Sequence, residues 1–245
     1  MKEERHIYGI RAIMEAVGAE TPINKVYLQK GLQGELFSKL EGVLRKERIS
    51  TSYVPIQKLD KLSSGNHQGA VALISSIAFQ PFEATIENIL EAQSQPLFLM
   101  LDGVNDVRNF GAIIRTAECS GVHAIIIPKS GSAPLNDIAI KTSAGAAFNI
   151  PIIKVDHLKD AIFYLQPSGI KIIAATEKAD DFIYSLDLKG PTALIMGSEE
   201  RGINPSTLKF VDEMGKLPIL GEIESLNVSV ACGAILYEIV RQRTA

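Results

Sequence analysis

Five nearly continuous apolar runs in the second part of the chain constrain its fold more than any other feature. The runs are LFLML (97–101), AIIIP (124–128), IIK (152–154), KIIAA (171–175) and ALIMG (193–197). Each has the length of a strand and lacks polar–apolar alternation, which is typical of strands buried on both faces of a parallel sheet. Helical patterns alternate with these runs near 110–120, 136–146, 157–166 and 226–242. The alternation predicts an α/β fold with helices on both sides of the sheet.

The first 78 residues show shorter and more mixed signals. Strand patterns cover 23–30, 50–54 and 70–75, and helical patterns cover 9–17, 35–47 and a short stretch after Pro55. A polar segment bounded by Pro81 and Pro96 follows. We read residues 79–95 as a linker that holds one helical stretch. The predicted organisation is therefore a small α/β domain at 1–78, a linker, and a larger parallel-sheet domain at 96–245.

Composition describes an ordinary globular chain and excludes several classes of protein. The sequence is 46% hydrophobic and 22% charged, and no apolar run approaches membrane-spanning length, so we expect no membrane partner and a cytoplasmic location. A net charge of −3 argues against binding nucleic acid through a bulk positive field, although it leaves room for a local basic surface. Cys119 and Cys232 lie in apolar helical patterns, which predicts buried, reduced thiols. The four histidines are scattered, so no metal site is expected.

Polar residues follow several of the predicted strands, at the edge of the sheet where ligands usually bind. Asn109 is placed to cap the helix near 110–120, and Arg115 lies beside the buried stripe of that helix. Glu199 follows the strand ALIMG directly, where a helix dipole alone would favour a carboxylate. Ser225 stands where the N-cap of the last helix belongs, whereas Asn227 would fall in its first turn, where capping does not explain it. Capping and a ligand site are both open interpretations of these residues.

The sequence lacks the short motifs of three common α/β enzyme classes. No GxGxxG follows a strand, no GxxxxGK[ST] is present, and no GxSxG is present. A dinucleotide-binding oxidoreductase is therefore disfavoured, and neither a P-loop nor a hydrolase elbow is predicted. Reasoning from the residues reaches an α/β ligand-binding domain and does not identify its reaction.

Three segments in order along the chain carry a resemblance to a known family. They are NFGAIIRTAECSGV (109–122), IMGSEERGI (195–203) and LPILGEIESLNVSVACGAILYEIVRQR (217–243). These closely resemble the three motifs of the SpoU, or TrmH-type, RNA 2′-O-ribose methyltransferases of the SPOUT superfamily. IYGIRAIMEAV (7–17) and NHQGAVALIS (66–75) look like the small substrate-binding domain of such enzymes, which is related in fold to certain ribosomal proteins. The second motif departs from many relatives in having Glu200 where they have Gly.

The resemblance implies a fold, a cofactor and a partner that periodicity does not predict. It implies a deep trefoil knot, with about 197–243 as the threaded part, a bent S-adenosylmethionine bound at the knot, no metal, and a homodimer. The implied activity is methylation of a ribose 2′-hydroxyl in RNA, with a guanosine of 23S ribosomal RNA as the nearest match. A tRNA methyltransferase and a catalytically silent RNA-binding relative are the alternatives.

By position in the motifs, the resemblance also assigns residues. The catalytic set that it implies is Asn109, Arg115, Glu199, Ser225 and Asn227. The cofactor-binding set, which we expect to act mostly through the main chain, is Thr176, Gly197, Leu217, Ile219 and Leu226. Because a guanidinium is always protonated, we expect Arg115 to orient groups and stabilise charge rather than act as a base. Domain 1–78 is expected to bind RNA without doing chemistry.

Overall fold

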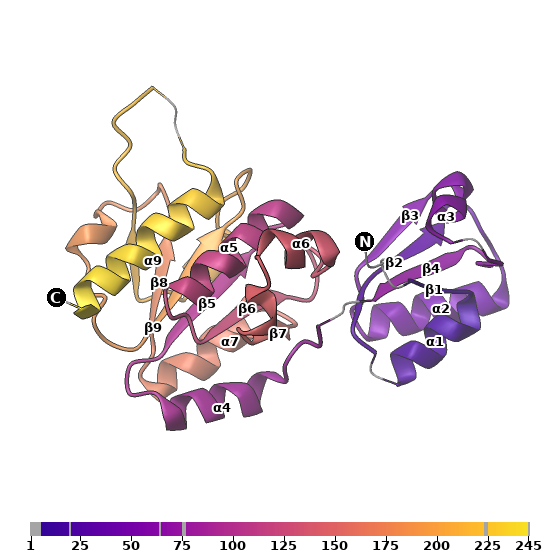
Figure 1. Ribbon diagram of the computed structural model, residues 1–245, viewed down its shortest axis with the longest axis horizontal. Coiled ribbons are helices and arrows are strands. Elements are labelled where there is room, and N and C mark those ends of the chain that lie inside the picture. Colours follow the sequence, from indigo (N-terminus) through magenta and orange to yellow (C-terminus); the bar gives the residue numbers. More distant parts are fainter. Residues whose placement is uncertain (1–5, 20, 64, 75–76, 223–224, 245) are drawn as a thin grey trace. The chain divides into compact units, whose positions relative to one another are not determined.

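Two units divide the chain in the computed structural model (Figure 1). The structure describes residues 6–19, 21–63, 65–74, 77–222 and 225–244. The first unit comprises Met1–Ala78 together with Pro134–Asp137, and the second comprises Phe79–Ala133 and Ile138–Ala245. Each unit has its own hydrophobic core, so each is described by itself.

The first unit is a four-stranded mixed sheet with helices packed on it. Its strands, in sheet order, are β1 (His6–Tyr8), β4 (Ala70–Ile74), β2 (Ile23–Gln29) and β3 (Thr51–Val54). Only the β2–β3 pair is parallel. The helices are α1 (Ile10–Gly18), α2 (Glu35–Lys46) and α3 (Ile56–Leu62). The expected alternation of strands and helices is thus present, and the short strand β1 was not predicted.

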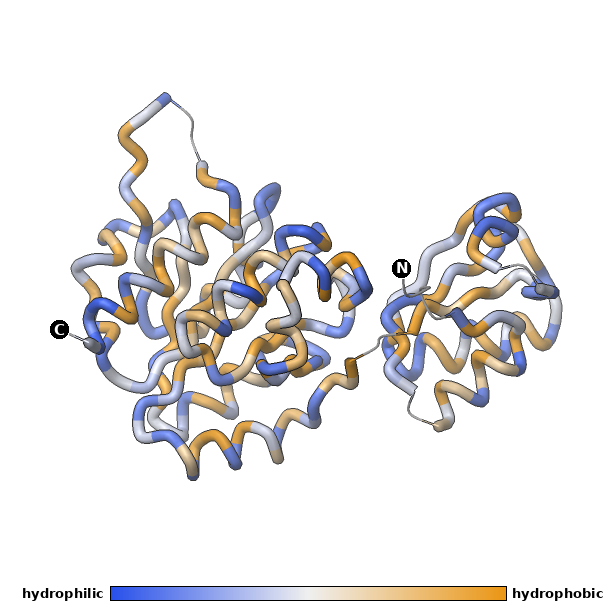
Figure 2. The backbone as a smooth tube through the Cα atoms, viewed as in Figure 1, coloured by the Kyte–Doolittle hydropathy of each residue, from blue (hydrophilic) through white to orange (hydrophobic). Residues whose placement is uncertain are grey.

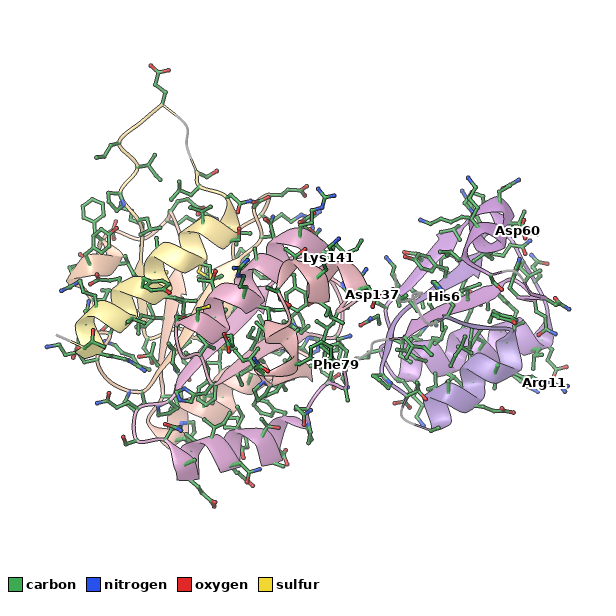
Figure 3. The ribbon with its side chains drawn as sticks, in the orientation of Figure 1. His6, Arg11, Asp60, Phe79, Asp137 and Lys141 are labelled. Carbon is green, nitrogen blue, oxygen red and sulfur yellow. The ribbon has the colours of Figure 1, made fainter. Side chains whose placement is uncertain are left out.

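A buried histidine joins two parts of the first unit. His67 is 8% exposed, and its Nδ1 accepts the backbone N–H of Gly69 at 3.0 Å. Its Nε2 lies 3.0 Å from Oδ1 of Asp60, which lies on α3 (Figure 3). Because Nδ1 is an acceptor, Nε2 carries the proton and donates to Asp60. His67 therefore ties α3 to the turn before β4, a structural role.

The second unit is built on six parallel strands. In sheet order they are β10 (Glu213–Gly215), β8 (Lys171–Ala175), β9 (Thr192–Gly197), β5 (Leu97–Asp102), β6 (Ala124–Pro128) and β7 (Ile152–Val155). All five predicted strands are present, and every pair in the sheet is parallel. The central strands are hydrophobic and buried along most of their length (Figure 2). The parallel α/β sheet predicted from the apolar runs is therefore confirmed.

Helices cover both faces of this sheet (Figure 1). The longer helices are α4 (Phe82–Ala92), α5 (Val107–Cys119), α7 (Leu158–Leu165) and α9 (Val228–Thr244), and the short ones are α6 (Asp137–Thr142) and α8 (Pro205–Leu208). Alternate residues of β5, such as Phe98 and Met100, share a core with α4 and α7. On the other face, α5 and α9 lie side by side.

Residues 79–95, which we expected to form a linker, belong to the second unit. Helix α4 lies in this segment, and its Ile86 is fully buried in the core of that unit. The ring of Phe82 packs edge-on against Tyr164 of α7, with the ring centroids 5.1 Å apart. The two prolines that bound the segment therefore delimit a packed helix rather than a free connection.

The two cysteines have different environments. Cys232 on α9 is fully buried, and burial raises the pKa of its thiol to about 12. Cys119 is the last residue of α5 and is exposed. The prediction of a buried thiol is therefore correct for Cys232 and wrong for Cys119, because the apolar stripe of α5 ends at Ala117.

Candidate functional site

Three predicted residues from distant segments meet in one hydrogen-bonded cluster. Asn227 donates from Nδ2 to Oε1 of Glu199 at 2.6 Å and to Oδ1 of Asn109 at 3.0 Å. Each residue comes from a different strand-end segment: Asn109 follows β5, Glu199 follows β9, and Asn227 precedes α9. We call Asn109, Glu199 and Asn227 the polar triad. Asn109 and Glu199 of the triad line a cavity of about 580 Å³, together with Asp106, Arg108 and Glu200.

The last helix begins two residues later than predicted, and Asn227 caps it. Oδ1 of Asn227 accepts the backbone N–H groups of Ser229 at 3.0 Å and Val230 at 3.4 Å. A side-chain oxygen that accepts from the second and third helical N–H groups is an N-cap. The prediction that Ser225 caps the helix is therefore wrong, and so is the placement of Asn227 within the first turn. Glu199 also accepts the N–H of Val228 at 3.1 Å, so a second segment helps to satisfy the helix end.

Asn109 is likewise not the cap of its helix. Oδ1 of Asp106 accepts the N–H groups of Arg108 at 2.9 Å and of Asn109 at 2.8 Å, so Asp106 is the N-cap of α5. Asn109 lies in the first turn, where its side chain is free to meet Asn227. Both corrections have one cause: a carboxylate or amide directly before the first helical residue, Asp106 or Asn227, accepts the free N–H groups of the helix end.

Arg115 lies on α5 but does not join the triad. It is six residues after Asn109, a rise of about 9 Å with a rotation of about 240° around the helix. Its side chain is exposed and, within the described part of the chain, makes no hydrogen bond or ion pair. The triad therefore binds its own members and leaves the guanidinium of Arg115 free.

A second, mostly apolar pocket lies beside the triad at the carboxyl ends of β8, β9 and β10. Four of the five predicted cofactor-binding residues line it, together with one residue of the predicted catalytic set: Thr176, Leu217, Ile219, Leu226 and Ser225. Residues that the sequence did not single out also contribute, namely Ala175, Glu177, Met196, Gly215, Lys216, Ala231 and Ile235. Their position next to predicted residues is the only signal that could have found them. Residues 223–224 of the same loop lie outside the described residues.

Main-chain groups of this pocket are free to bind a ligand. In the described part of 217–226 no backbone hydrogen bond is formed, whereas Thr176 N–H is bound to Gly215 O at 3.0 Å. Gly215 is closely packed, because an added Cβ would lie 2.9 Å from Ile183 Cδ1 and Leu186 Cδ1 and 3.0 Å from the Cα of Ile183. Apolar walls with unpaired N–H and C=O groups suit a flat heterocycle whose polar edge bonds to the main chain.

Gly197, the fifth predicted cofactor residue, lies beneath the turn that carries Glu199. An added Cβ at Gly197 would overlap the backbone of Gly202 and Ile203. Ser198 N donates to Gly202 O at 3.2 Å, and Gly202 N donates to Ser198 O at 2.9 Å, which closes the turn. Gly202 takes a left-handed conformation, with φ of 64°, that favours glycine. The exposed Glu200 fits this turn without disturbing Glu199.

The described part of the chain has neither a metal cluster nor a membrane-spanning helix. Among the described residues, no group of three or more His, Cys, Asp or Glu side chains is placed to hold a metal ion. None of the helices in the described part of the chain combines the length and hydrophobicity needed to span a bilayer.

The fold and the site define an α/β protein with cavities at the carboxyl edge of a parallel sheet. Comparison with known proteins makes this specific: the chain belongs to the SpoU rRNA Methylase family, whose profile matches residues 96–237. A second profile, RNA 2′-O ribose methyltransferase substrate binding, matches residues 6–80. The resemblance inferred from the three motifs is therefore confirmed.

Curated relatives match along the whole chain. The 23S rRNA (guanosine-2′-O-)-methyltransferase RlmB of Pseudomonas aeruginosa is 38% identical over 251 residues, which cover 100% of this chain and 99% of that protein. The enzyme of the same name from Pasteurella multocida is 39% identical, covering 98% of this chain and 99% of its own length.

Solved structures agree with the fold. The SpoU methyltransferase AviRb from Streptomyces viridochromogenes, in complex with the cofactor AdoMet, has a TM-score of 0.63 at 23% identity and covers 99% of this chain and 91% of its own. A TrmH/SpoU tRNA modifying enzyme of A. aeolicus has a TM-score of 0.56 at 29% identity, covering 66% of this chain and 84% of its own.

Proposed function

We propose that this protein transfers the methyl group of S-adenosylmethionine to the ribose 2′-hydroxyl of a guanosine in 23S ribosomal RNA. The observation that carries the proposal is the meeting of Asn109, Glu199 and Asn227, one from each family motif, beside an apolar pocket. Relatives named for this reaction match 98–100% of the chain, which supports ribosomal RNA over tRNA as the substrate. Such an enzyme would act in the cytoplasm, where ribosomal RNA is found.

The pocket lined by Thr176, Leu217, Ile219 and Leu226 would hold the cofactor. Its apolar walls suit the adenine ring, and the unpaired main-chain groups of 217–222 and 225–226 suit its polar edge. When bound, the cofactor supplies an electrophilic methyl group on a sulfonium. The side chains present therefore need only bind, orient and handle one proton.

The polar triad would fix the reacting ribose. Asn227 uses its amide N–H groups on Glu199 and Asn109, so the second oxygen of the Glu199 carboxylate remains available as an acceptor for a hydroxyl. Ser225, which lines the apolar pocket two residues before Asn227, would contribute a hydroxyl. Arg115 would orient an RNA phosphate and stabilise charge as the hydroxyl proton leaves, since its guanidinium is free to do so.

We also infer a deep trefoil knot in the second unit. The connection between β8 and β9 contacts the C-terminal segment near its start, at Lys216, and near its end, at Gln242 and Arg243. Before the site loop, Lys216 N donates to Asp181 O at 3.0 Å and Ile183 N donates to Lys216 O at 2.8 Å. Near the end of α9, Gln242 Nε2 donates to Leu186 O at 3.1 Å. Arg243 donates to Leu188 O at 3.2 Å and to Gly190 O at 2.5 Å. Contacts at both ends support threading of this segment through the connection.

A homodimer is a further part of the proposal. Apolar side chains that stay exposed in the single chain gather on and just before α9, where Leu226 is 44%, Val230 57% and Tyr237 53% exposed. A contiguous apolar stripe of this kind favours covering by another protein surface. Sedimentation velocity should give the mass of two chains, and Tyr237→Glu should shift it toward one.

The first unit would bind RNA and resemble ribosomal-protein folds. The match of residues 6–80 to a substrate-binding family supports this role. Its own hydrophobic core supports separate folding. Deleting residues 1–78 should leave cofactor affinity unchanged and sharply weaken methylation of RNA.

The proposed activity is tested with in vitro transcribed 23S rRNA, total tRNA and labelled S-adenosylmethionine. We expect label at one guanosine ribose of the 23S rRNA, and undiminished transfer in the presence of chelator if the RNA stays folded. Label confined to tRNA would identify the alternative substrate. Cofactor binding without transfer to any RNA would identify a silent relative and overturn the proposal.

A further inference from the structure

A third cavity is separated from the cavity at the triad by the turn that carries Glu199. Its volume is about 710 Å³, within the range of roughly 300–1,000 Å³ that is typical of ligand sites. It lies beyond the carboxyl ends of β5, β6, β7 and β9, between the start of α7 and the turn before α8. We call it the basic groove, after Lys159, Arg201 and Lys209 in its wall. Neither the triad nor the apolar pocket accounts for it.

The two acidic side chains of the groove have partners, whereas its lysines and arginine form no ion pair within the described part of the chain. Oδ2 of Asp102 accepts the N–H of Asn204 and the hydroxyl of Thr207, both at 3.0 Å, so its charge anchors the turn before α8. Asp156 is paired with Lys129 at 2.9 Å.

By contrast, Lys159, Arg201 and Lys209 are exposed, and in the described part of the chain none of them forms an ion pair. The unpaired charge of the groove is therefore positive, although the whole chain has a net charge of −3. A local positive surface on an acidic chain suits phosphate groups.

An aromatic ring stands in the same groove. Phe163 of α7 is 50% exposed, so part of its ring is open to a ligand in the groove. Its centroid is 4.8 Å from that of Phe210, and the ring planes meet at 70°, so an edge-to-face contact fixes its orientation. A rigid, half-exposed ring beside unpaired cations is the combination that binds single-stranded nucleic acid, with a base on the ring and phosphates on the cations.

The groove is physically joined to the site of reaction. Ser198 lines both the groove and the cavity at the triad. The turn 198–202 forms the wall between them, and Ser198 Oγ accepts the N–H of Arg201 at 3.2 Å, which braces the turn. Glu199 and Arg201 thus lie two residues apart on one turn, with one facing each cavity.

We propose that the basic groove binds the single-stranded RNA segment next to the methylated nucleotide. Lys159, Arg201 and Lys209 hold its phosphates, and Phe163 stacks on one of its bases. This inference rests on the proposed function, because it takes RNA as the substrate of the triad. It adds a substrate-binding surface in the methyltransferase unit itself, separate from the one in residues 6–80.

The test compares Lys159→Ala, Lys159→Ala/Lys209→Ala and Phe163→Leu with a matched control, Lys189→Ala. Lys189 is an exposed lysine of the same unit that lies outside the groove. Single-turnover methylation of in vitro transcribed 23S rRNA, at several RNA and salt concentrations, gives the apparent RNA affinity and its salt dependence. Calorimetry with S-adenosylmethionine and a thermal melt are run on each variant.

We expect each removed lysine to lower the slope of log affinity against log salt by about 0.7, the value for a single-strand phosphate contact. Loss of the ring should weaken RNA binding roughly fivefold or more, without changing the salt slope. Lys189→Ala should match the wild type in both respects, and cofactor affinity should stay unchanged throughout.

Two results would overturn the inference while the wild type still methylates the RNA. One is groove variants that equal Lys189→Ala in affinity and salt slope. The other is loss of cofactor affinity in the groove variants, which would assign the groove to the cofactor instead. Absence of methylation by the wild type itself would refute the proposed function, and this inference with it.

Discussion

Asn227 donates a hydrogen bond to Glu199 across 2.6 Å, and the same carboxylate oxygen accepts the backbone N–H of Val228. The bond links the turn after β9 to the N-cap of α9. Because Oδ1 of Asn227 caps α9 while Nδ2 binds Glu199 and Asn109, one amide serves the helix and the site at once. This dual use makes the two roles separable by substitution.

Asn227→Asp should keep the helix and lose the reaction. An aspartate retains the oxygen that accepts from Ser229 and Val230 and is favoured at a helix N-terminus. It has no N–H to donate and would place a carboxylate against Glu199. We expect a stability change within about 1 kcal/mol and a fall in single-turnover rate of about 100-fold, as for a misplaced reacting group.

Asn227→Ala is the comparison for that variant, because it removes both roles. It should lose about 1 kcal/mol of stability along with the cap, in addition to activity. Thermal melts beside single-turnover methylation separate the two effects. An aspartate variant with wild-type turnover would show that the triad does not position the substrate.

Gly197→Ala should damage the site through the backbone. The new methyl group would overlap Gly202 and Ile203, so the turn that carries Glu199 must move. Forcing extra volume into a packed site costs about 1–3 kcal/mol. Gly190→Ala is the matched control, since an added Cβ there meets nothing within 4 Å. Equal melting temperatures for the two variants would contradict the close approach beneath the turn.

The sequence predicts the second unit well because burial on both faces leaves a strong local signal. Strands such as 97–101 and 124–128 are apolar throughout, and all of them form. The edge strand Glu213–Gly215 was missed, because three residues with an exposed methionine carry no such signal. Residues 79–95 looked like a linker because a helix with one fully buried side chain, Ile86, reads as polar.

The candidate site was predictable in its members but not in its bonds. Family motifs pointed to Asn109, Glu199 and Asn227, yet Asn109 and Asn227 are 118 positions apart, and only the fold decides that they touch. The predicted caps of α5 and α9 were wrong by three and two residues. Several polar residues near each helix start could accept the free N–H groups, and tertiary contacts determine which one does. Arg115 was placed in the same catalytic set, but six residues along α5 from Asn109 it forms no hydrogen bond with the triad.

The two thiols should react at very different rates. Cys119 is exposed, whereas Cys232 is buried and burial raises its pKa to about 12, which removes the reactive thiolate. An aromatic disulfide reagent at pH 8 should label one thiol quickly in the folded protein and two in denaturant. Cys119→Ser should abolish the fast phase. Two fast thiols in the native protein would contradict the burial of Cys232.

Lys154 should make stability depend on pH above neutrality. Burial, with a smaller effect of the nearby Lys129, lowers the pKa of Lys154 from 10.5 to about 8. Between pH 8 and 10.5 the unfolded chain therefore binds the proton more strongly, so stability rises with pH across that range. Below pH 8 Lys154 is charged in both the folded and the unfolded chain, so folding carries the full cost of burying its charge. The Phe79 ring, whose centroid is 3.9 Å from the ammonium, offsets part of that cost.

Lys154→Met tests this directly, because methionine keeps an unbranched side chain of nearly the same length and removes the charge. The free energy of unfolding, measured by denaturant titration at pH 7, 8, 9 and 10, should rise with pH in the wild type. The variant should be more stable at pH 7 and should lose most of that rise. If the free energy of unfolding rose equally with pH in the two proteins, Lys154 would not be the cause of the pH dependence.

The exposed guanidinium of Arg115 can be removed without disturbing the core, so its part in turnover can be measured separately from stability. Because its side chain is exposed and unpaired among the described residues, Arg115→Ala should change stability by no more than about 0.5 kcal/mol. If the guanidinium orients an RNA phosphate and stabilises charge at the reacting hydroxyl, turnover should fall by about 100-fold or more while cofactor affinity stays unchanged. Arg115→Lys should recover little, since an ammonium lacks the planar fork that engages two oxygens together. Single-turnover methylation at saturating RNA, with calorimetry for the cofactor, separates these effects. A folded Arg115→Ala protein with near wild-type turnover would show that the exposed arginine has no part in the reaction.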